Sequence, residues 1–552
     1  MSSARKNIIF LFISLLFILT SGKNSFAQRQ VHLFPDRNFC VSGDTLWFNT
    51  VIFPGDDTKT GNVVHVQLDG LKNQHITKVS VACKNNKGHG FLPVPDSLSS
   101  GIYVLKSFIL AENITITNQR LIAVYNRFDR NLGSLEIPLI KNPVHFEDAP
   151  GVSIKTNKSL YKSGETVILD IHIPEETGSG LSCSFISAAI ADPLTEDFSS
   201  FYIPGNIDEQ TLPGISVTEN EGILISGKVS SLNNSPAPGA IVLLSIPDTI
   251  PFFDYCISDT DGLFYFYLKN ARGTGNFVIQ ALSGSGENCK VELSENYIGT
   301  TGDFETQGKI LSYEEKTFAA DIIDASYYER LFAGYRHPAP EKFSMPPGFP
   351  YPFYGKPTKT IFPEEFIDLP DFTEISRELL HGVQYREKKN KTTIRLIDYG
   401  SEVLFKGEPL KLFDGIPVFD PHFFSSLGTM DIKKVDVVFY KRFFGSLAFN
   451  GILAFYSNDK PIDWQGALPG AGIFRYQCLQ PESRQLIVNE VNTDNNNPDF
   501  RKVFFHEGYD HITPERQLSF LTSDVSGKVA IRLIAVTRDN KILYAEKIVE
   551  VE

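Results

Sequence analysis

Short apolar stretches separated by turn residues run along most of the chain. Residues 45–52, 63–68 and 102–105 have apolar side chains over lengths typical of strands, and Pro, Gly, Asp and Ser lie between these stretches. β-Branched and aromatic residues favour strands, whereas turns need residues that tolerate a positive φ or fix φ. Strands of this length at this spacing predict a β-sandwich near the start of the chain.

A short repeat occurs at the start of two strand-rich blocks. Residues 36–46 read DRNFCVSGDTL and residues 157–167 read NKSLYKSGETV, so a Ser-Gly-acid-Thr sequence precedes a strand in both. We expect Gly43 and Gly164 to supply a positive φ in these turns. A match this short can arise by chance. Its position at the start of both blocks nevertheless predicts that two sandwiches share one design.

The middle of the chain changes character. Residues 222–293 contain short strands with Pro- and Gly-rich turns. Residues 338–363 are rich in proline and aromatic residues, and we expect an extended linker or a strap over a neighbouring domain, because proline removes a donor and fixes φ. Helical patterns occur near residues 319–332 and, with the clearest periodicity, at residues 372–383. Residues 501–552 read as one more β-module.

The first 27 residues have the pattern of a cleavable signal peptide. Arg5 and Lys6 form a positive segment, residues 8–19 are apolar, and the sequence Ser-Phe-Ala at 25–27 places small residues where signal peptidase reads them. The apolar run is too short to span a bilayer, which argues against an uncleaved membrane anchor. The sequence predicts export, with no lipid-attachment cysteine near the cleavage site and no later transmembrane segment.

The chain is acidic, and this restricts its partners. Its 552 residues carry 52 Lys and Arg against 65 Asp and Glu, a formal charge of −13, and loss of the three positive charges of the signal peptide gives −16. Nucleic acids and anionic membrane surfaces require a basic face, so neither is expected as a partner. The 44 Phe and 21 Tyr residues suit pleated sheets.

Six cysteines are scattered along the chain without a CxxC pair, so no zinc site is expected. Export would permit disulfides, and Cys40 with Cys83 and Cys256 with Cys289 each fall within one predicted module. Each bridge could add about 2–4 kcal/mol. Isolated buried thiols are an equally good alternative, because modules of this size fold without disulfides.

Several stretches resemble modules of exported proteins. The two sandwich blocks, through residues 39–48, 92–103 and 160–169, resemble macroglobulin-type (MG2-like) domains of large exported proteins of Gram-negative bacteria. Residues 222–293, with the sequences GKV, PGA and DTDGLF, resemble the carboxypeptidase-regulatory-like domain, a small transthyretin-like sandwich. That domain is an accessory module, so the resemblance implies no peptidase activity.

Residues 366–458 resemble the plug domain of TonB-dependent outer-membrane receptors, through the sequences PLKLFDGIPV, IKKVDV and FNGIL. The chain departs from two of these family patterns. A receptor plug is followed by a transmembrane barrel of many strands, whereas the residues that follow here read as a β-module without a barrel pattern. A macroglobulin that traps proteases covalently has a thioester motif with adjacent Cys, Gly, Glu and Gln, and no such run occurs here.

Pattern and resemblance together predict a mainly β fold, a string of β-sandwich modules (macroglobulin- or immunoglobulin-like and transthyretin-like) with a small α+β plug-like domain. The predicted parts are a signal peptide (1–27), a first MG2-like sandwich (28–128), a second macroglobulin-like sandwich (150–220), a carboxypeptidase-regulatory-like domain (221–300), a linker with the Pro/aromatic strap (301–365), a plug-like domain (366–460) and a C-terminal β-module (461–552).

Two motifs suggest a metal and fail on inspection. His172 and Glu175 have the His-x-x-Glu spacing of zinc carboxypeptidases, but Pro174 interrupts them and no third ligand is apparent. The sequence Asp-Thr-Asp-Gly from Asp259 resembles the start of a calcium loop, but the twelfth position is Asn270 rather than Glu, so a hairpin turn is preferred. No nucleophile elbow, Walker loop or dinucleotide fingerprint occurs. We therefore predict no catalytic residue, cofactor or metal ligand.

The strap contains a dense aromatic cluster. Phe349, Tyr351, Phe353 and Tyr354 alternate with prolines and could form a recognition surface, because aromatic residues concentrate binding energy. The alternative is that they pack against the protein's own domains.

The function expected from these features is non-enzymatic binding or scaffolding in the Gram-negative cell envelope, in the periplasm or at the outer membrane or cell surface. A protein partner is expected, with an outer-membrane barrel as one candidate. The main alternative is a macroglobulin-like protein that interacts with proteases without a thioester. A weaker third hypothesis is a hydrolase with a site assembled between modules.

Overall fold

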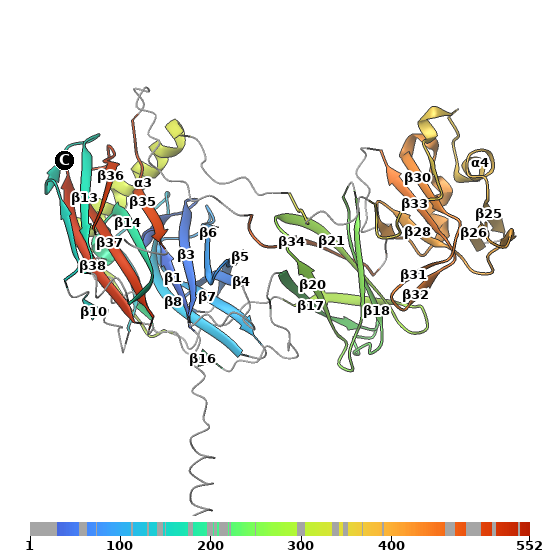
Figure 1. The fold of residues 1–552 in the computed structure, drawn as a ribbon, viewed down its shortest axis with the longest axis horizontal. Helices are drawn as coiled ribbons and strands as arrows, with labels where there is room; N and C mark the ends of the chain where they lie inside the picture. Colours follow the sequence, from blue (N-terminus) through green and yellow to red (C-terminus); the bar gives the residue numbers. More distant parts are fainter. Residues whose placement is uncertain are drawn as a thin grey trace, which may run out of the picture. The chain divides into compact units, whose positions relative to one another are not determined.

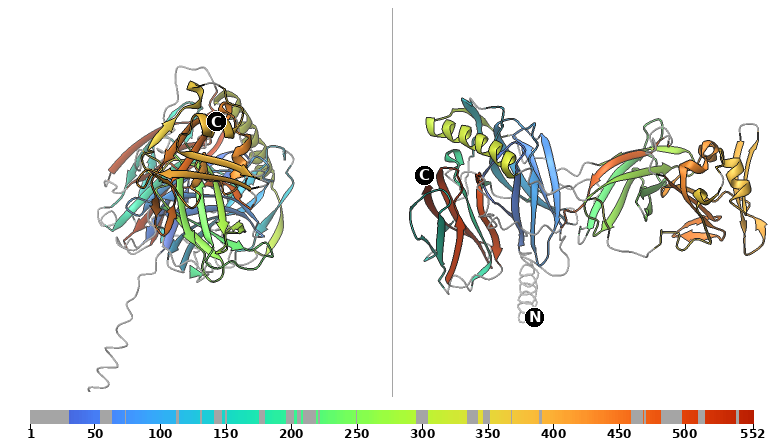
Figure 2. Two further views of the ribbon diagram at one scale, coloured as in Figure 1. Left: turned by 90° about the vertical axis from the view of Figure 1, so that its right-hand side faces the viewer. Right: turned by 90° about the horizontal axis from the view of Figure 1, so that it is seen from above.

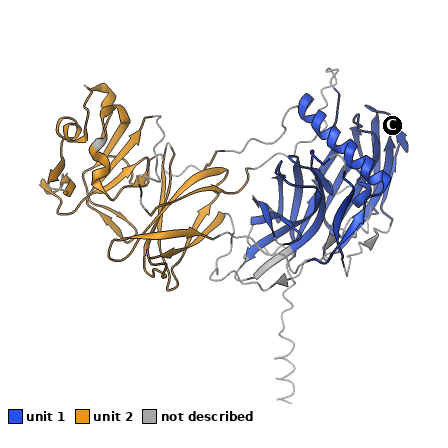
Figure 3. Ribbon diagram, turned by 180° about the vertical axis from the view of Figure 1, so that it is seen from behind, with its two compact units in different colours: residues 1–220, 297–338, 482–552 blue, residues 221–296, 339–481 orange. Residues whose placement is uncertain are grey.

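The computed structural model divides the chain into two units (Figure 1, Figure 3). Unit 1 comprises residues 1–220, 297–338 and 482–552, and unit 2 comprises residues 221–296 and 339–481. The predicted signal peptide lies outside the described residues. The structure describes residues 30–552 except 54–62, 73, 112–113, 130–131, 141–146, 149–150, 175–179, 196–201, 204–206, 209–218, 220–221, 249, 295–303, 334–341, 346–350, 367, 389–390, 459–467, 469, 482–497, 510–514 and 539–540.

Unit 1 starts with a β-sandwich of two sheets. One sheet has the strand order β1-β3-β6, and the other has the order β15-β8-β7-β4-β5, with β2 and β16 also paired to β8. In β4, Val64, Val66 and Leu68 face the core and polar residues alternate with them. The strands are β1 (Gln30–Pro35), β2 (Phe39–Val41), β3 (Thr45–Phe53), β4 (Val63–Gly70), β5 (His75–Ala82), β6 (Lys87–Pro93), β7 (Gly101–Ala111), β8 (Ile114–Tyr125), β15 (Tyr202–Ile203) and β16 (Ile207–Asp208).

A second sandwich in unit 1 is assembled from two distant stretches of chain. One sheet has the order β11-β13-β36, and the other has the order β10-β38-β37-β14-β35, with β12 paired to β38. The strands are β10 (Glu147–Asp148), β11 (Ser153–Thr156), β12 (Leu160–Tyr161), β13 (Thr166–His172), β14 (Leu181–Ile190), β35 (Val503–Tyr509), β36 (Glu515–Leu521), β37 (Gly527–Thr537) and β38 (Ile542–Val551).

This arrangement corrects two predicted domain boundaries. Residues 150–220 and 461–552 were expected to be separate modules, but β13 pairs with β36, and β14 pairs with both β35 and β37. Strands of the two stretches therefore complete each other's sheets. Hydrophobic patterning reports each strand but not its partner, so a sandwich interrupted by a long insertion reads as two modules.

The two sandwiches have the same topology. The order β1-β3-β6 corresponds to β11-β13-β36, and β8-β7-β4-β5 corresponds to β38-β37-β14-β35, with β2 and β12 each added in parallel to the last strand. His32 pairs with Val51, and Ser153 pairs with His172, so both partners are shifted by the same 121 residues. The shared design predicted from the repeat is confirmed. The difference lies in one connection, because residues 71–74 join β4 to β5 whereas residues 191–502 join β14 to β35.

Helix α3 (Tyr313–Ala333) lies within this long connection and contributes to a core shared by both sandwiches (Figure 2). Its Ile322 and Ile323 belong to one apolar cluster with Val104 of the first sandwich and Ile186 of the second. The helix predicted near residues 319–332 is therefore confirmed. A two-stranded ribbon precedes the helix, and a short helical turn follows β14; these elements are β9 (Ser134–Pro138), β23 (Thr306–Ile310) and η1 (Pro193–Thr195).

Unit 2 contains a sandwich with the strand order β19-β18-β21-β22-β17-β20, and β34 also pairs with β21. The segment from Asp259 is a turn, because the Asp259 carboxylate accepts the backbone N–H groups of Asp261 and Leu263 at 2.9 and 2.8 Å. The turn does not close the expected hairpin, since it joins β19 to β20, and these strands pair with β18 and β17 rather than with each other. The strands are β17 (Gly222–Ser230), β18 (Ile241–Ile246), β19 (Phe252–Ile257), β20 (Leu263–Lys269), β21 (Thr274–Leu282), β22 (Asn288–Leu293) and β34 (Gly472–Gln477).

An α+β domain completes unit 2, around a sheet of order β24-β30-β33-β28-β29. Helix α4 (Phe372–Glu378) is capped by Asp371 and ends earlier than the predicted 372–383, because Gly382 has φ +93° and Val383 starts β25. The other elements are β24 (Lys359–Ile361), η3 (Pro363–Glu365), β25 (Val383–Lys388), β26 (Lys391–Asp398), β27 (Val403–Leu404), β28 (Leu410–Phe413), β29 (Ile416–Pro417), η4 (Pro421–Ser426), η5 (Thr429–Asp431), β30 (Ile432–Val438), β31 (Arg442–Phe444), β32 (Leu447–Phe449) and β33 (Ile452–Ser457).

The predicted fold class is confirmed: the chain is mainly β and is built from several sandwiches with an added α+β domain. In the described ranges, no helix has both the length and the apolar character needed to cross a membrane.

Candidate functional site

A dense polar cluster in the described part of the chain is centred on the first copy of the sequence repeat. Gly43 adopts φ +82° in the turn between β2 and β3, and this turn brings Asp44 back toward the strand that precedes it. The Asp44 carboxylate accepts the backbone N–H of Val41 at 3.2 Å and pairs with Arg37 at 3.3 Å. Arg37 also donates to the carbonyl of Thr45 at 3.1 Å and pairs with Asp36 at 2.8 Å.

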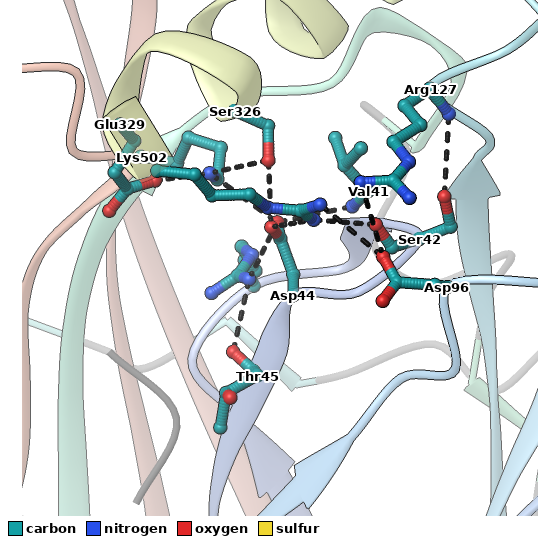
Figure 4. A network of polar contacts seen from close by, with 11 residues as sticks. Val41, Ser42, Asp44, Thr45, Asp96, Arg127, Ser326, Glu329 and Lys502 are labelled. Carbon is teal, nitrogen blue, oxygen red and sulfur yellow. Dashed lines mark hydrogen bonds and ion pairs between the residues drawn. The ribbon is translucent and has the colours of Figure 1, made fainter. Parts of the chain in front are cut away.

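Two further segments meet at the same carboxylate (Figure 4). Ser326 of α3 donates to Asp44 Oδ1 at 2.8 Å, and Lys502, which immediately precedes β35, pairs with Asp44 Oδ2 at 3.4 Å. Lys502 also pairs with Glu329 of α3 at 2.5 Å. The first sandwich, the helix and the second sandwich are thus joined at one point. We call Arg37, Asp44, Ser326, Glu329, Arg330 and Lys502 the junction.

Arg330 of α3, which also belongs to the junction, extends the cluster toward the surface. Its guanidinium donates to the carbonyl of Ser42 at 2.6 Å and lies 3.6 Å from Asp44 Oδ1 and 3.4 Å from Asp96 Oδ1. Arg127 approaches the same Asp96 oxygen at 3.6 Å. Asp96 is half exposed, so this outer part is screened by water, whereas Asp44, Arg37 and Lys502 are buried.

Burial and nearby charges shift the pKa values of the junction in opposite directions. Burial favours a neutral Asp44, but Lys502 and Arg37 outweigh it and lower the pKa of Asp44 to about 2. For neighbouring Asp36, burial is the larger effect, and its pKa is raised to about 6 despite the contact with Arg37. Asp44 and Glu329 raise the pKa of Lys502 against the effect of burial. Asp44 and the two cations paired with it, Arg37 and Lys502, are therefore charged at neutral pH.

A second buried carboxyl group lies where the long connection leaves the second sandwich. Asp192 follows β14, and both of its oxygens accept the hydroxyl of Tyr125, the last residue of β8, at 3.0 and 2.9 Å. Its Oδ1 also accepts the backbone N–H of Leu194 at 2.9 Å. Burial is the largest effect on Asp192 and raises its pKa to about 7, and nearby Glu315 acts in the same direction.

The second copy of the repeat has the same local bonds without the burial. The Glu165 carboxylate accepts the backbone N–H of Lys162 at 3.1 Å and pairs with Lys158 at 3.1 Å, which repeats the contacts of Asp44 with Val41 and Arg37. Lys158 is about half exposed, at 52%, and Glu165 is 34% exposed. Only the first copy is enclosed by other segments of the chain.

The chemistry of the junction suits structural coupling. Asp44 is held as a carboxylate by three cations, and a group with a pKa of about 2 is too weak a base to abstract a proton at neutral pH. Across the part of the chain that is described, no three His, Cys, Asp or Glu side chains are grouped so that they could hold a metal ion. His172 is exposed at the end of β13, and Glu175 lies outside the described residues.

The aromatic residues predicted as a recognition surface are divided by the structure. Tyr351 is 44% exposed, but Tyr354 is buried, with its hydroxyl 2.6 Å from that of Tyr456 and 3.1 Å from Asp436. Phe353 is partly buried and stacks on Phe253 with ring centroids 4.3 Å apart. These two residues pack as an intramolecular strap, which corrects their proposed role. Phe349 lies outside the described residues.

The six cysteines are free thiols, and the sheet order explains why the two suggested pairs do not form. Cys256 and Cys289 lie on β19 and β22, and β18 and β21 run between those strands, so about 14 Å of strand spacing separates the pair. Cys40 lies on β2 and Cys83 follows β5, and β8, β7 and β4 lie between these strands. A disulfide needs Cα atoms within about 7 Å. The alternative of isolated thiols matches the structure.

Sequence comparisons identify no relative, because no protein-family model and no curated protein sequence matches the chain. Among solved structures, the alignment with native Escherichia coli alpha-2-macroglobulin covers 95% of this chain and 40% of the macroglobulin, at 8% identity and a TM-score of 0.23. The alignment with Salmonella alpha-2-macroglobulin reacted with methylamine covers 95% of this chain and 39% of the macroglobulin, at 9% identity and a TM-score of 0.22. The alignment with a tetra-tandem repeat from the extending region of a large adhesion protein covers 95% of this chain and 100% of the repeat structure, at 8% identity and a TM-score of 0.15.

These structural similarities are too weak to assign a family. TM-scores this low carry no argument about shared architecture or activity, and the chain spans about 40% of the length of the two macroglobulins. The class of the protein therefore follows from its own structure: a mainly β protein in which one of two like sandwiches contains a long insertion. The macroglobulin, carboxypeptidase-regulatory and receptor-plug resemblances remain predictions.

Proposed function

We propose that this chain is a non-enzymatic binding or scaffolding protein of the Gram-negative cell envelope. In this proposal the two sandwiches of unit 1 form a stable base, and unit 2 carries the binding surface. The export signal and the module resemblances found in the sequence support the location. An outer-membrane protein is the partner favoured by the plug-like resemblance of residues 366–458.

The observation that carries this proposal is the attachment of the long connection to the first sandwich. The connection is held where it leaves β14, through Asp192 and Tyr125, and where it returns to β35, through Lys502 and Asp44. Between these points Ser326 of α3 bonds to the same Asp44. Polar groups buried with this many partners cost much to disrupt, so the base is expected to keep its structure while unit 2 engages a partner.

The α+β domain of unit 2 provides surface suited to binding. Contiguous groups of exposed large apolar side chains mark interaction surfaces, whereas single ones are normal, and aromatic residues often dominate interfaces. Phe443 and Met430 are 70% and 66% exposed. The other exposed apolar residues of this domain are Phe362, Phe366, Tyr399, Val403, Phe419 and Tyr440.

Site-specific photo-crosslinking in intact cells tests the proposal. A crosslinking amino acid is placed at Phe443 or at Met430 in unit 2 and, as matched controls, at the exposed Phe128 and Ile548 of unit 1. We expect the unit 2 positions to capture one and the same outer-membrane protein and the unit 1 positions to capture none. Recovery of the chain in the cytoplasm, or an absence of adducts at Phe443 and Met430, would contradict the proposal. A stable complex with added proteases would instead favour the macroglobulin-like alternative.

A further inference from the structure

The ribbon formed by β9 and β23 has only these two strands, so in the described part of the chain no further strand pairs with the outer edge of β23. The backbone N–H of Leu139 donates to the carbonyl of Glu305 at 2.7 Å, and that of Leu311 donates to the carbonyl of Gly133 at 3.1 Å. In an antiparallel pair, residues alternate between facing the partner strand and facing away. Odd-numbered residues of β23 therefore bond to β9, and the backbone groups of Thr306, Gly308 and Ile310 point outward.

These outward groups are accessible. Thr306, Gly308 and Ile310 are all exposed, and within the described part of the chain none of them makes a backbone hydrogen bond on the outer side. A strand edge with free N–H and C=O groups is a template for another extended strand. The chemistry of this edge thus selects an extended backbone as its occupant.

The two edges of the ribbon are protected differently. Pro138 of β9 is opposite Thr306, so its nitrogen points away from β23, and proline has no N–H to offer to a further strand. The central position on the free edge of β23 is Gly308, which has no side chain to hinder an approaching backbone. β23 contains no proline, and its one charged residue, Lys309, is paired with Glu315 at 2.5 Å. Only the β9 edge therefore has a feature that blocks pairing.

We propose that β23 of a second copy of this chain pairs with this edge in antiparallel orientation, with Gly308 on the two-fold axis. The pairing joins two ribbons into a four-stranded sheet. It sets Thr306 opposite Ile310 and Gln307 opposite Lys309 of the second copy, so no like charges face each other. An isologous contact of this kind uses one surface twice and closes on itself, which gives a dimer rather than a fibre.

Exposed apolar side chains next to the edge supply contact area. Ile310 is 81% exposed, and Tyr313, at the start of α3, is 86% exposed. Pairing of the two strands would cover Ile310 of both copies and bring Tyr313 of each toward the other ribbon. The shared strand is five residues long, so the interface is small, and we expect a weak, concentration-dependent dimer.

Sedimentation equilibrium of the purified chain, from low micromolar to several hundred micromolar, tests this proposal. Gly308→Pro removes the central outward N–H and leaves the bonds between β9 and β23 intact, because those use the odd-numbered residues. Gly308→Ala is the matched control: its Cβ would meet nothing closer than a Glu136 oxygen at 3.7 Å, and the N–H remains. We expect the wild type and Gly308→Ala to dimerise, and Gly308→Pro to weaken dimerisation at least tenfold.

A second variant separates the edge contact from any folding defect. Ile310→Lys places a charge on an exposed position of the edge, where it opposes strand addition without disturbing the core. We expect it to weaken dimerisation as well, with the thermal midpoint of the monomer unchanged. A wild-type chain that stays monomeric over the whole range overturns the proposal. So does a dimer that both Gly308→Pro and Ile310→Lys leave unaffected, because its interface would lie elsewhere.

Discussion

In the first sandwich, the carboxylate of the turn before the third strand is buried among cations, whereas the corresponding carboxylate of the second sandwich faces solvent. Asp44 and Glu165 accept the same kind of backbone N–H and pair with a cation seven residues earlier. The short sequence shared by both turns therefore fixes the same local bonds. It does not fix their surroundings, since only Asp44 is also reached by α3 and by Lys502.

The difference follows from where each turn lies relative to the insertion. Residues 191–502 leave and re-enter the second sandwich, and the ends of this connection, together with α3, pack on the first sandwich. The turn of the first sandwich becomes a point of attachment, and its ion pairs lose contact with water. A buried ion pair gains little over an apolar replacement, but removal of one partner leaves an unpaired charge at a large cost. The same substitution should thus have unequal effects in the two copies.

Neutralising the two carboxylates is expected to show the largest contrast. Asp44→Asn leaves Lys502 and Arg37 without their shared counter-ion, and we expect it to lower the free energy of unfolding of unit 1 by about 3–5 kcal/mol. Glu165→Gln, on the exposed pair with Lys158, should leave stability unchanged. Urea unfolding followed by circular dichroism measures both. Equal effects of the two substitutions would show that burial does not distinguish the copies.

The pH dependence of stability gives a second contrast, at the ends of the last strands. Tyr125 ends β8 and bonds to the buried Asp192, whereas the equivalent residue of the second sandwich is the exposed Glu552, directly after β38. The pKa of Asp192 is raised from 3.8 to about 7, so the folded state binds this proton more tightly than the unfolded state. Its contribution to stability is thus fully present below about pH 4 and is lost as the pH rises to 7.

Asp192→Asn should remove this dependence. We expect the variant to match or exceed the wild type in stability, with a gap that widens from pH 4 to pH 7 to about 3–4 kcal/mol and is constant above that. Urea unfolding of both proteins at pH 4, 5.5, 7 and 8 measures the gap. Other titrating groups are common to both proteins and cancel in the difference. A gap independent of pH would mean that Asp192 is already ionised in the fold at pH 4.

The comparison of the two turns also shows what could be read from the sequence. The repeat, the positive φ of Gly43 and Gly164 and the mainly β class follow from local pattern, and the structure confirms them. The junction could not be found in this way. Lys502 and Ser326 are separated from Asp44 by hundreds of residues, and nothing in their local sequence indicates that they meet. Without an estimate of burial, Asp44 and Glu165 look alike.

The same limit explains the wrong domain boundaries and why the sequence left the state of the cysteines open. The pairing of β14 with β35 spans the whole insertion, and periodicity carries no information about partners at that distance. Cys256 and Cys289 are close in sequence and lie in one sheet, yet β18 and β21 separate their strands. For Tyr354 the sequence left recognition and intramolecular packing open, and the bond of its hydroxyl to Asp436, which lies 82 residues away in sequence, shows that it packs within the protein. In each case the answer depends on which strands or segments are neighbours in space, and local sequence does not specify this.

The smallest contrast expected is between the two turn glycines. Gly43 and Gly164 have φ values of +82° and +71°, so Ala is strained at both by about 1–2 kcal/mol. A Cβ at Gly43 would also lie 2.2 Å from Asp96 Oδ1 and 2.7 Å from Arg330 Nη2, whereas nothing lies within 4 Å of a Cβ at Gly164. We therefore expect Gly43→Ala to cost about 1 kcal/mol more than Gly164→Ala, because Asp96 and Arg330 must separate.

Double-mutant cycles with Asp96→Ala resolve this difference. In the Asp96→Ala background the nearest obstacle to a Cβ at residue 43 is gone and Arg330 loses one ion-pair partner, so the cost of Gly43→Ala should fall toward that of Gly164→Ala. Gly164→Ala should be insensitive to Asp96→Ala, because no atom of the first sandwich comes within reach of its Cβ. An extra cost at Gly43 that is unchanged without Asp96 would contradict this explanation, because the contact with Asp96 would then not be its source.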